Sequence, residues 1–151
     1  MKKILDFEKG ELLNKMLVLA TNRHAGQFDK GGSPYILHPL AVMYDLGSVD
    51  EEVMCIALGH DVIEDTDTTY AELREIGFTD RIIDGIRCLT KIAGESYEEY
   101  KAKVKSNVDS IKVKKSDLKH NTRIDRLRGV TSKDMARIER YFRFYLELES
   151  M

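Results

Sequence analysis

The chain has 151 residues, which is enough for one domain with a single hydrophobic core. Its 24 Lys and Arg nearly balance its 26 Asp and Glu, and the basic residues are spread along the sequence. This balance gives no reason to expect a nucleic-acid or membrane partner. We therefore treat residues 1–151 as a single globular domain.

Nothing in the sequence indicates export or membrane insertion. Residues 1–10 lack the apolar core and small-residue cleavage site of a signal peptide. No apolar run reaches the length that spans a bilayer. Cys55 and Cys88 lie among apolar residues outside any Cys-x-x-Cys pair, which favours two reduced, buried thiols. We expect a cytoplasmic protein.

Apolar residues at helical spacing, together with helix start and stop signals, predict an all-α protein of roughly eight helices. In chain order the expected helices cover 11–26, 38–47, 50–65, 69–77, 80–91, 96–107, a segment within 107–129, and 132–150. Between the first two, Gly31-Gly32 and Ser33-Pro34 predict a loop. No segment alternates between apolar and polar residues as a half-buried strand would.

The clearest local predictions concern the ends and faces of three helices. Thr69 with Glu72, and Ser96 with Glu99, have the spacing of capping boxes. The last helix is strongly amphipathic, and we assign one of its stripes to the core. That stripe consists of Met135, Ile138, Phe142 and Tyr145.

The segment LGHDVIEDT places one imidazole and three carboxylates around a short apolar turn. These groups belong to His60, Asp61, Glu64 and Asp65. In a helix His60 and Glu64 share one face, and Asp61 and Asp65 share another. Imidazole and carboxylate together suit a divalent ion such as Zn, Mn or Fe. His60 and Asp61 can reach one ion that lies off the end of the helical turn, with further ligands from elsewhere.

Two other segments offer such ligands. His38 follows an apolar pair in YILHPL, and Asp117 precedes His120 in VKKSDLKHN. Each segment alone has a simpler interpretation, because a single His is more often a core or surface residue and a lysine-rich helix face is usually solvated. EDTDTT, likewise, is a helix end followed by an N-cap. Their coincidence in one short chain favours a metal site.

Three segments in this order resemble the signatures of a known family. HAGQFDKGGSPYILHP, HDVIEDT and KKSDLKHN are similar to those of the HD-domain superfamily, in its RelA/SpoT-type alarmone hydrolase branch. The stand-alone members of that branch are the small alarmone hydrolases. The resemblance runs from the first helix to the last and implies a compact helical HD domain around a metal site. It implies the metal ligands His38, His60, Asp61 and Asp117, and the water-activating pair Glu64 and Asp65.

The same resemblance implies a reaction, a cofactor and a substrate. Family members remove pyrophosphate from the 3′ position of the alarmone nucleotide (p)ppGpp, which leaves GDP or GTP. The implied ion is manganese, and another divalent transition metal is compatible with the mixed nitrogen and oxygen ligands. The expected partner is a small nucleotide, and the oligomeric state stays open. The implied substrate contacts are Lys30, Asn121, Arg137 and Tyr141, the last two of which also suit a surface arginine and a core aromatic.

One position departs from the family pattern. The family's hydrolases carry an arginine that stacks on the base immediately before the loop lysine, and this chain has Asp29 there. An aspartate cannot stack on a base, although it can accept a hydrogen bond from a base amino group. Arg126 is a candidate replacement for the lost basic contact. Two alternatives therefore stay open: the same chemistry on an adenosine alarmone or the 2′-phosphate of NADPH, and a nucleotide sensor that does not cleave.

Overall fold

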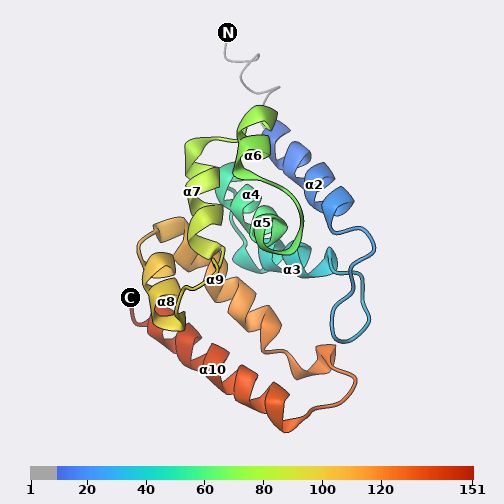
Figure 1. Ribbon diagram of the computed structural model, residues 1–151, viewed down its shortest axis with the longest axis vertical. Helices are drawn as coiled ribbons and strands as arrows, with labels where there is room; N and C mark the ends of the chain where they lie inside the picture. Colours follow the sequence, from blue (N-terminus) through green and yellow to red (C-terminus); the bar gives the residue numbers. More distant parts are fainter. Residues whose placement is uncertain (1–9) are drawn as a thin grey trace.

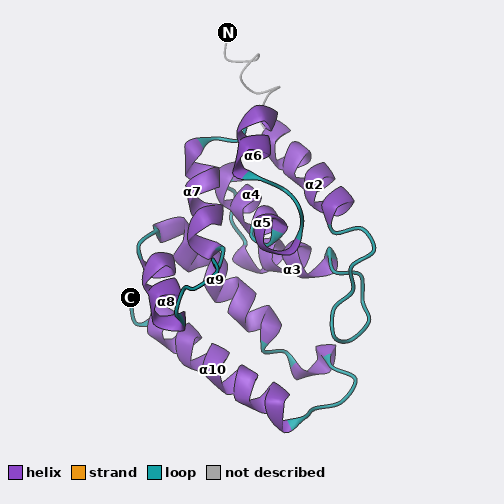
Figure 2. Cartoon of the chain, in the orientation of Figure 1, coloured by secondary structure: helices purple, strands orange, loops and turns teal. Residues whose placement is uncertain are grey.

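The computed structural model describes residues 10–151, and this part of the chain folds into packed helices without a β-strand (Figures 1 and 2). The predicted all-α class is confirmed. The helices are α2 (Glu11–Arg23), α3 (Leu37–Leu46), α4 (Glu51–Gly59), α5 (Val62–Asp65), α6 (Tyr70–Ile76), α7 (Asp80–Leu89), α8 (Tyr97–Lys105), α9 (Val108–Asn121), the 3₁₀ turn η1 (Ile124–Arg126) and α10 (Ser132–Glu149). The N-terminal segment considered above lies almost entirely outside the described residues.

Helix α4 forms the centre of the hydrophobic core. It contacts α2, α3, α7 and α9, and every residue from Cys55 to Gly59 is buried. Such burial on all sides is typical of a core helix. Helix α10 instead packs along α9 at the edge of the molecule (Figure 1). The α4 helix therefore ends inside the protein, and its last residue leads directly to His60.

The capping predictions are confirmed at both helices. Thr69 and Glu72 form a reciprocal capping box at α6, and Ser96 and Glu99 form another at α8. Each box satisfies backbone N–H groups that the first helical turn leaves unpaired. These ends are set by hydrogen bonds between neighbours in the sequence, so the prediction needed no tertiary information.

The predicted core stripe of α10 is wrong in part. Met135 and Phe142 are more than half exposed, and the buried residues of this helix are Phe144 and Leu148. Because α10 packs at the edge of the molecule, only a narrow face is covered. The residues one and two turns before Phe144 on that face are Tyr141 and Arg137, which are partly buried.

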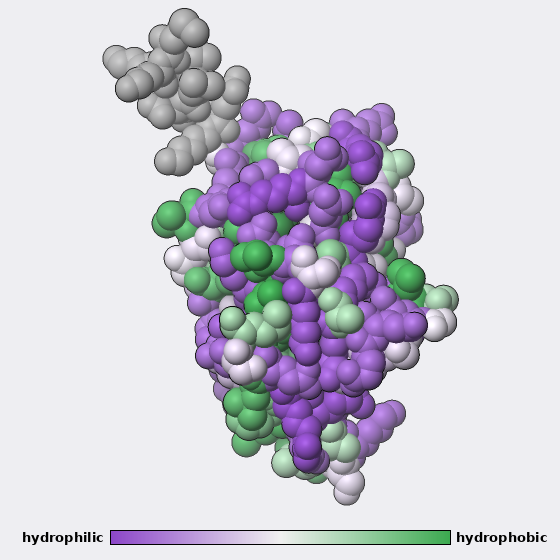
Figure 3. Space-filling view, turned by 90° about the vertical axis from the view of Figure 1, so that its left-hand side faces the viewer, coloured by the Kyte–Doolittle hydropathy of each residue, from purple (hydrophilic) through white to green (hydrophobic). Residues whose placement is uncertain are grey.

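The surface and the cysteines agree with the composition only in part. Figure 3 shows a face that is mostly hydrophilic, with apolar side chains in small separate groups. No helix among residues 10–151 is long and apolar enough to cross a membrane. Both cysteines are free thiols, but only Cys55 is buried; Cys88, on α7, is half-exposed, so its predicted burial is wrong.

The close contact between α4 and α7 gives a stability prediction. A Cβ atom on Gly85 would lie 2.4 Å from Cδ1 of the buried Ile56. Overpacking costs about 1–3 kcal/mol, which exceeds the helix-propensity gain of about 1 kcal/mol for alanine. We expect Gly85→Ala to lower the free energy of unfolding, measured in urea. The control is Gly129→Ala, where nothing lies within 4 Å of the added atom. Equal unfolding midpoints for the two variants would contradict the described packing.

Candidate metal centre and adjoining cavity

A break in the predicted 50–65 helix directs His60 and Asp61 toward one point. Helix α4 ends at Gly59 and α5 begins at Val62, so the expectation of one continuous helix is wrong. Neighbouring residues in an unbroken helix point about 100° apart. Here His60 Nε2 lies 3.0 Å from Asp61 Oδ2. The side chain of Val62, which is fully buried, anchors the turn in the core.

Residues from two other helices complete the cluster. His38, in the first turn of α3, and Asp117, near the end of α9, are both buried. His38 Nε2 lies 2.9 Å from Asp117 Oδ1 and 3.7 Å from Asp61 Oδ2. His60 Nε2 lies 3.4 Å from Asp117 Oδ1. Ligands about 2.1 Å from one ion are roughly 3 Å from one another, so these four side chains have the spacing of a coordination shell.

The hydrogen bonding of His60 provides an independent test of whether a cation fits. Its Nδ1 lies 2.6 Å from the carbonyl oxygen of Ala57, which places the ring proton on Nδ1. The buried Nε2 atom then has a free lone pair and makes no hydrogen bond among the described residues. Buried polar atoms almost always have a partner. A lone pair that faces the Asp61 carboxylate is stabilised by a cation between them, so the donor set fits a divalent metal ion.

The charges of the cluster lead to the same conclusion. Burial opposes a charge on His60, yet the carboxylates of Asp61 and Asp117 raise the pKa of His60 well above its usual value. The two carboxylates therefore attract positive charge strongly enough to offset desolvation. A metal ion supplies that charge without protonating its histidine ligands.

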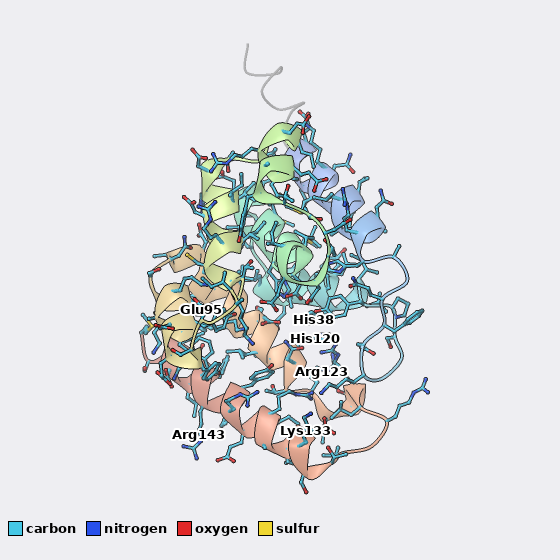
Figure 4. The ribbon with its side chains drawn as sticks, viewed as in Figure 1. His38, Glu95, His120, Arg123, Lys133 and Arg143 are labelled. Carbon is cyan, nitrogen blue, oxygen red and sulfur yellow. The ribbon has the colours of Figure 1, made fainter. Side chains whose placement is uncertain are left out.

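A second layer of polar groups holds each ligand. The Tyr35 hydroxyl donates to Asp61 Oδ2 at 2.7 Å. Lys114 Nζ donates to Asp117 Oδ2, also at 2.7 Å. His38 Nδ1 lies 2.7 Å from His120 Nδ1, and Figure 4 shows these two histidines together at the centre of the molecule. Such outer contacts fix the orientation of metal ligands and the tautomer of each imidazole.

His120 is suited to accept a hydrogen bond from His38. Desolvation and the positive charge of Arg126 lower the pKa of His120 to about 4. The His120 ring is therefore neutral, and its Nδ1 can accept the proton carried by His38 Nδ1. This arrangement leaves His38 Nε2 available for a cation. His120 thus supports the metal cluster from outside it.

Glu64 and Asp65 lie beside the cluster but differ from each other. Oxygen atoms of Asp61, Glu64 and Asp65 can all lie within 4.8 Å of one another. Glu64 Oε1 accepts a hydrogen bond from the backbone N–H of Lys91 at 2.8 Å, so its position is fixed. The Asp65 side chain is exposed and borders a cavity. Desolvation and the negative charges of Asp61 and Glu64 raise the pKa of Asp65 to about 6, which suits a general base.

The cluster opens into a cavity of about 400 Å³. The loop around Phe28 and Asp29 borders it on one side, and Lys91 and Tyr100 border it elsewhere. Six cationic side chains line it: Lys30, Lys91, Lys114, Arg123, Arg126 and Arg137. A cavity with this charge, next to a site for a divalent ion, suits a ligand that carries several phosphates.

All four predicted substrate contacts border the cavity. Arg137 and Tyr141 lie one turn apart on the inner face of α10. Lys30 is largely exposed, and its Nζ lies 3.7 Å from Asp134. Asn121 makes structural hydrogen bonds: its Nδ2 donates to Asp117 Oδ1 at 2.8 Å, and its Oδ1 accepts from Arg126 at 3.3 Å.

The departure at Asp29 has a structural counterpart. Arg126 Nη2 lies 3.2 Å from Asp29 Oδ2, and both residues border the cavity. The two segments that carry them are closely packed, because a Cβ atom on Gly31 would lie 2.1 Å from the Arg126 carbonyl oxygen. The basic group that the loop lacks is therefore present in the cavity wall, contributed by a segment almost a hundred residues later.

Sequence reasoning missed several residues that surround the centre. Tyr35 and Lys114 each lie three residues before a predicted ligand, so helical i, i+3 spacing could have found Lys114. Lys91 and Arg123 had no comparable signal. They reach the cavity only because the segments after α7 and α9 pass beside it.

No family model matches the chain, but individual proteins do. It is 37% identical over 97 residues to an *Aquifex aeolicus* protein named guanosine-3′,5′-bis(diphosphate) 3′-pyrophosphohydrolase, which covers 63% of this chain and 14% of that protein. It is 32% identical over 123 residues to the *Escherichia coli* bifunctional (p)ppGpp synthase/hydrolase SpoT, which covers 74% of this chain and 18% of that protein. The chain thus spans less than a fifth of the length of these curated relatives.

A solved structure shares the fold. It is described as a metazoan ortholog of SpoT that hydrolyzes ppGpp and plays a role in starvation responses. The TM-score is 0.75 at 22% identity, over 91% of this chain and 84% of the other. Together with the sequence matches, this fold shows that the chain belongs to the RelA/SpoT-type branch of the HD-domain superfamily.

Proposed function

We propose that this chain is a manganese-dependent hydrolase that removes the 3′-pyrophosphate of (p)ppGpp. One observation carries the proposal: a cluster with the donor set and spacing for a divalent ion lies beside Glu64 and Asp65 in a cavity lined by cations. The names of the relatives in *Aquifex aeolicus* and *Escherichia coli* support the choice of substrate.

His38, His60, Asp61 and Asp117 would hold the ion in this reaction. When bound, the ion would polarise the phosphoryl group and acidify a water molecule. Manganese is proposed because the set combines two imidazoles with two carboxylates, which suits a first-row divalent metal.

Asp65 acts as the general base. Its carboxylate accepts a proton from the attacking water, while Glu64, held by the Lys91 backbone, orients that water. The water oxygen bonds to the inner phosphorus of the 3′-diphosphate, and the bond from that phosphorus to the ribose 3′-oxygen breaks. The 3′-oxygen then takes up a proton. The products are pyrophosphate and GDP, or GTP from the pentaphosphate.

The remaining cations bind and orient the rest of the nucleotide. Arg137 and Tyr141 on α10 are placed to contact phosphate and ribose, and Lys30 and Arg123 border the same cavity. Charge-assisted hydrogen bonds to phosphate are stronger than neutral ones. Asp29, which Arg126 keeps ionised, is able to accept a hydrogen bond from a base amino group.

The test is the release of pyrophosphate, with Mn²⁺ present, from guanosine tetraphosphate, its adenosine counterpart and NADPH, with free phosphate measured in parallel. We expect pyrophosphate from the guanosine compound. Release from an adenine compound alone would keep the chemistry and overturn the proposed substrate. No release from any of the three, in protein shown to contain metal, would contradict the hydrolase and favour a nucleotide sensor.

A further inference from the structure

Lys91 differs from the other cations of the cavity because it lacks a carboxylate partner within residues 10–151. The ion pairs of the others are Lys114 with Asp117, Arg126 with Asp29, Arg123 with Asp125, and both Lys30 and Arg137 with Asp134. Glu95, the acidic residue of the same loop, pairs with Lys103 at 2.7 Å. The charge of Lys91 is therefore not neutralised by the described protein.

The position of Lys91 is nevertheless well defined. Its backbone N–H donates to Glu64, and its Nζ lies 5.2 Å from the centre of the Tyr100 ring. Lys114 Nζ lies 5.3 Å from the centre of the same ring. Two ammonium groups thus flank one aromatic ring that borders the cavity. The repulsion between them is relieved when an anion binds nearby.

The place of this pair relative to the metal centre narrows the choice of anion. Lys91 is fixed to Glu64, and Lys114 is fixed to the proposed ligand Asp117. In Figure 4, Glu95 of the Lys91 loop lies to the left of His38, whereas Arg123 lies below it. The cavity therefore has cations on two different sides of the metal centre, and Lys91 belongs to the side next to the water-activating carboxylates.

We propose that Lys91 binds the outer phosphate of the 3′-diphosphate, the one that water does not attack. This proposal rests on the proposed function, because it assumes that the inner phosphorus lies at the metal centre. The outer phosphate stays attached to the attacked phosphorus and leaves in pyrophosphate. Lys91 therefore selects a diphosphate over a single phosphate, and inorganic pyrophosphate is the smallest probe of the contact.

The experiment compares the binding of pyrophosphate and orthophosphate by calorimetry, at one fixed Mn²⁺ concentration, for the wild-type chain and Lys91→Ala. The substitution keeps the backbone N–H that holds Glu64. Loss of a charge-assisted contact should weaken pyrophosphate binding about tenfold or more and leave orthophosphate within about twofold. Lys91→Arg should restore most of the difference. The control is Lys112→Ala, which removes an exposed lysine outside the cavity.

The possible results separate this proposal from the proposed function. Unchanged pyrophosphate binding in Lys91→Ala, or a wild-type chain that binds pyrophosphate no better than orthophosphate, would overturn the role of Lys91 even if the chain hydrolyses ppGpp. A selective loss of pyrophosphate binding would support it even if the chain does not hydrolyse ppGpp. An equal loss for both anions would also contradict it, because that result indicates a general charge effect.

Discussion

The His60→Ala variant is expected to lose its metal ion and its turnover while it keeps its fold. His60 Nε2 is buried, has no hydrogen-bond partner among the described residues, and faces two carboxylates. Loss of an outer-shell contact alone lowers metal affinity about 10- to 100-fold, so loss of a ligand should lower it at least as much. Mn²⁺ content after dialysis, pyrophosphate release and the circular dichroism spectrum are the three measurements.

His60 is a cleaner choice than Asp117 for this test. Alanine at Asp117 would also leave the ammonium of Lys114 without its partner, and breaking a buried ion pair costs about 3–5 kcal/mol. The control is His24→Ala, which removes another buried histidine that lies outside the proposed ligand set. We expect that variant to retain Mn²⁺. A His60→Ala protein that keeps a full complement of Mn²⁺ and normal turnover would show that the assigned metal centre is wrong.

The Asp65→Asn variant is expected to keep its metal ion and lose its turnover. The side chain is exposed, and the Gln27 contact that holds this part of the loop uses the Asp65 backbone carbonyl, which the substitution leaves in place. An amide cannot accept the water proton, and general-base catalysis typically contributes about 10²- to 10⁴-fold in rate. We therefore expect kcat to fall by that factor, measured as pyrophosphate release at saturating Mn²⁺.

Asp67→Asn is the matched control for this second experiment. Asp67 lies on the same loop, is largely exposed, and pairs with Arg23 at the surface. Its replacement should leave kcat nearly unchanged. If Asp65→Asn kept the wild-type rate, another group would have to act as the base. If it lost Mn²⁺ together with activity, Asp65 would be a ligand, a role that its distance from Asp61 also permits.

Local chemistry explains why much of the fold could be predicted from the sequence. Apolar residues at helical spacing recorded the helices, and Thr69 and Ser96 marked two helix starts through bonds to residues three positions away. The quoted segments also contained all four side chains that converge at the cluster. Their resemblance to one family depends on residue types and order alone, so it could be seen before any contact was known.

Other features depend on residues that are distant in the sequence. The break after Gly59 has no proline to announce it, and α10 exposes Phe142 because only one narrow face of that helix packs on α9. Helical periodicity indicates that a face is apolar, but how much of it is covered depends on the neighbouring helices. For this reason the continuous helix and the core stripe were wrong.

The sequence by itself determined the helical class, two of the helix caps and the set of side chains able to hold a metal ion. The tertiary structure decided how the cavity is charged. It pairs Asp29 with Arg126 and places Lys91 beside Glu64 without a carboxylate partner among the described residues. Ion pairs between distant segments form only after the helices pack. The sequence can therefore show which charges are present, but only the folded chain shows which of them remain available to a ligand.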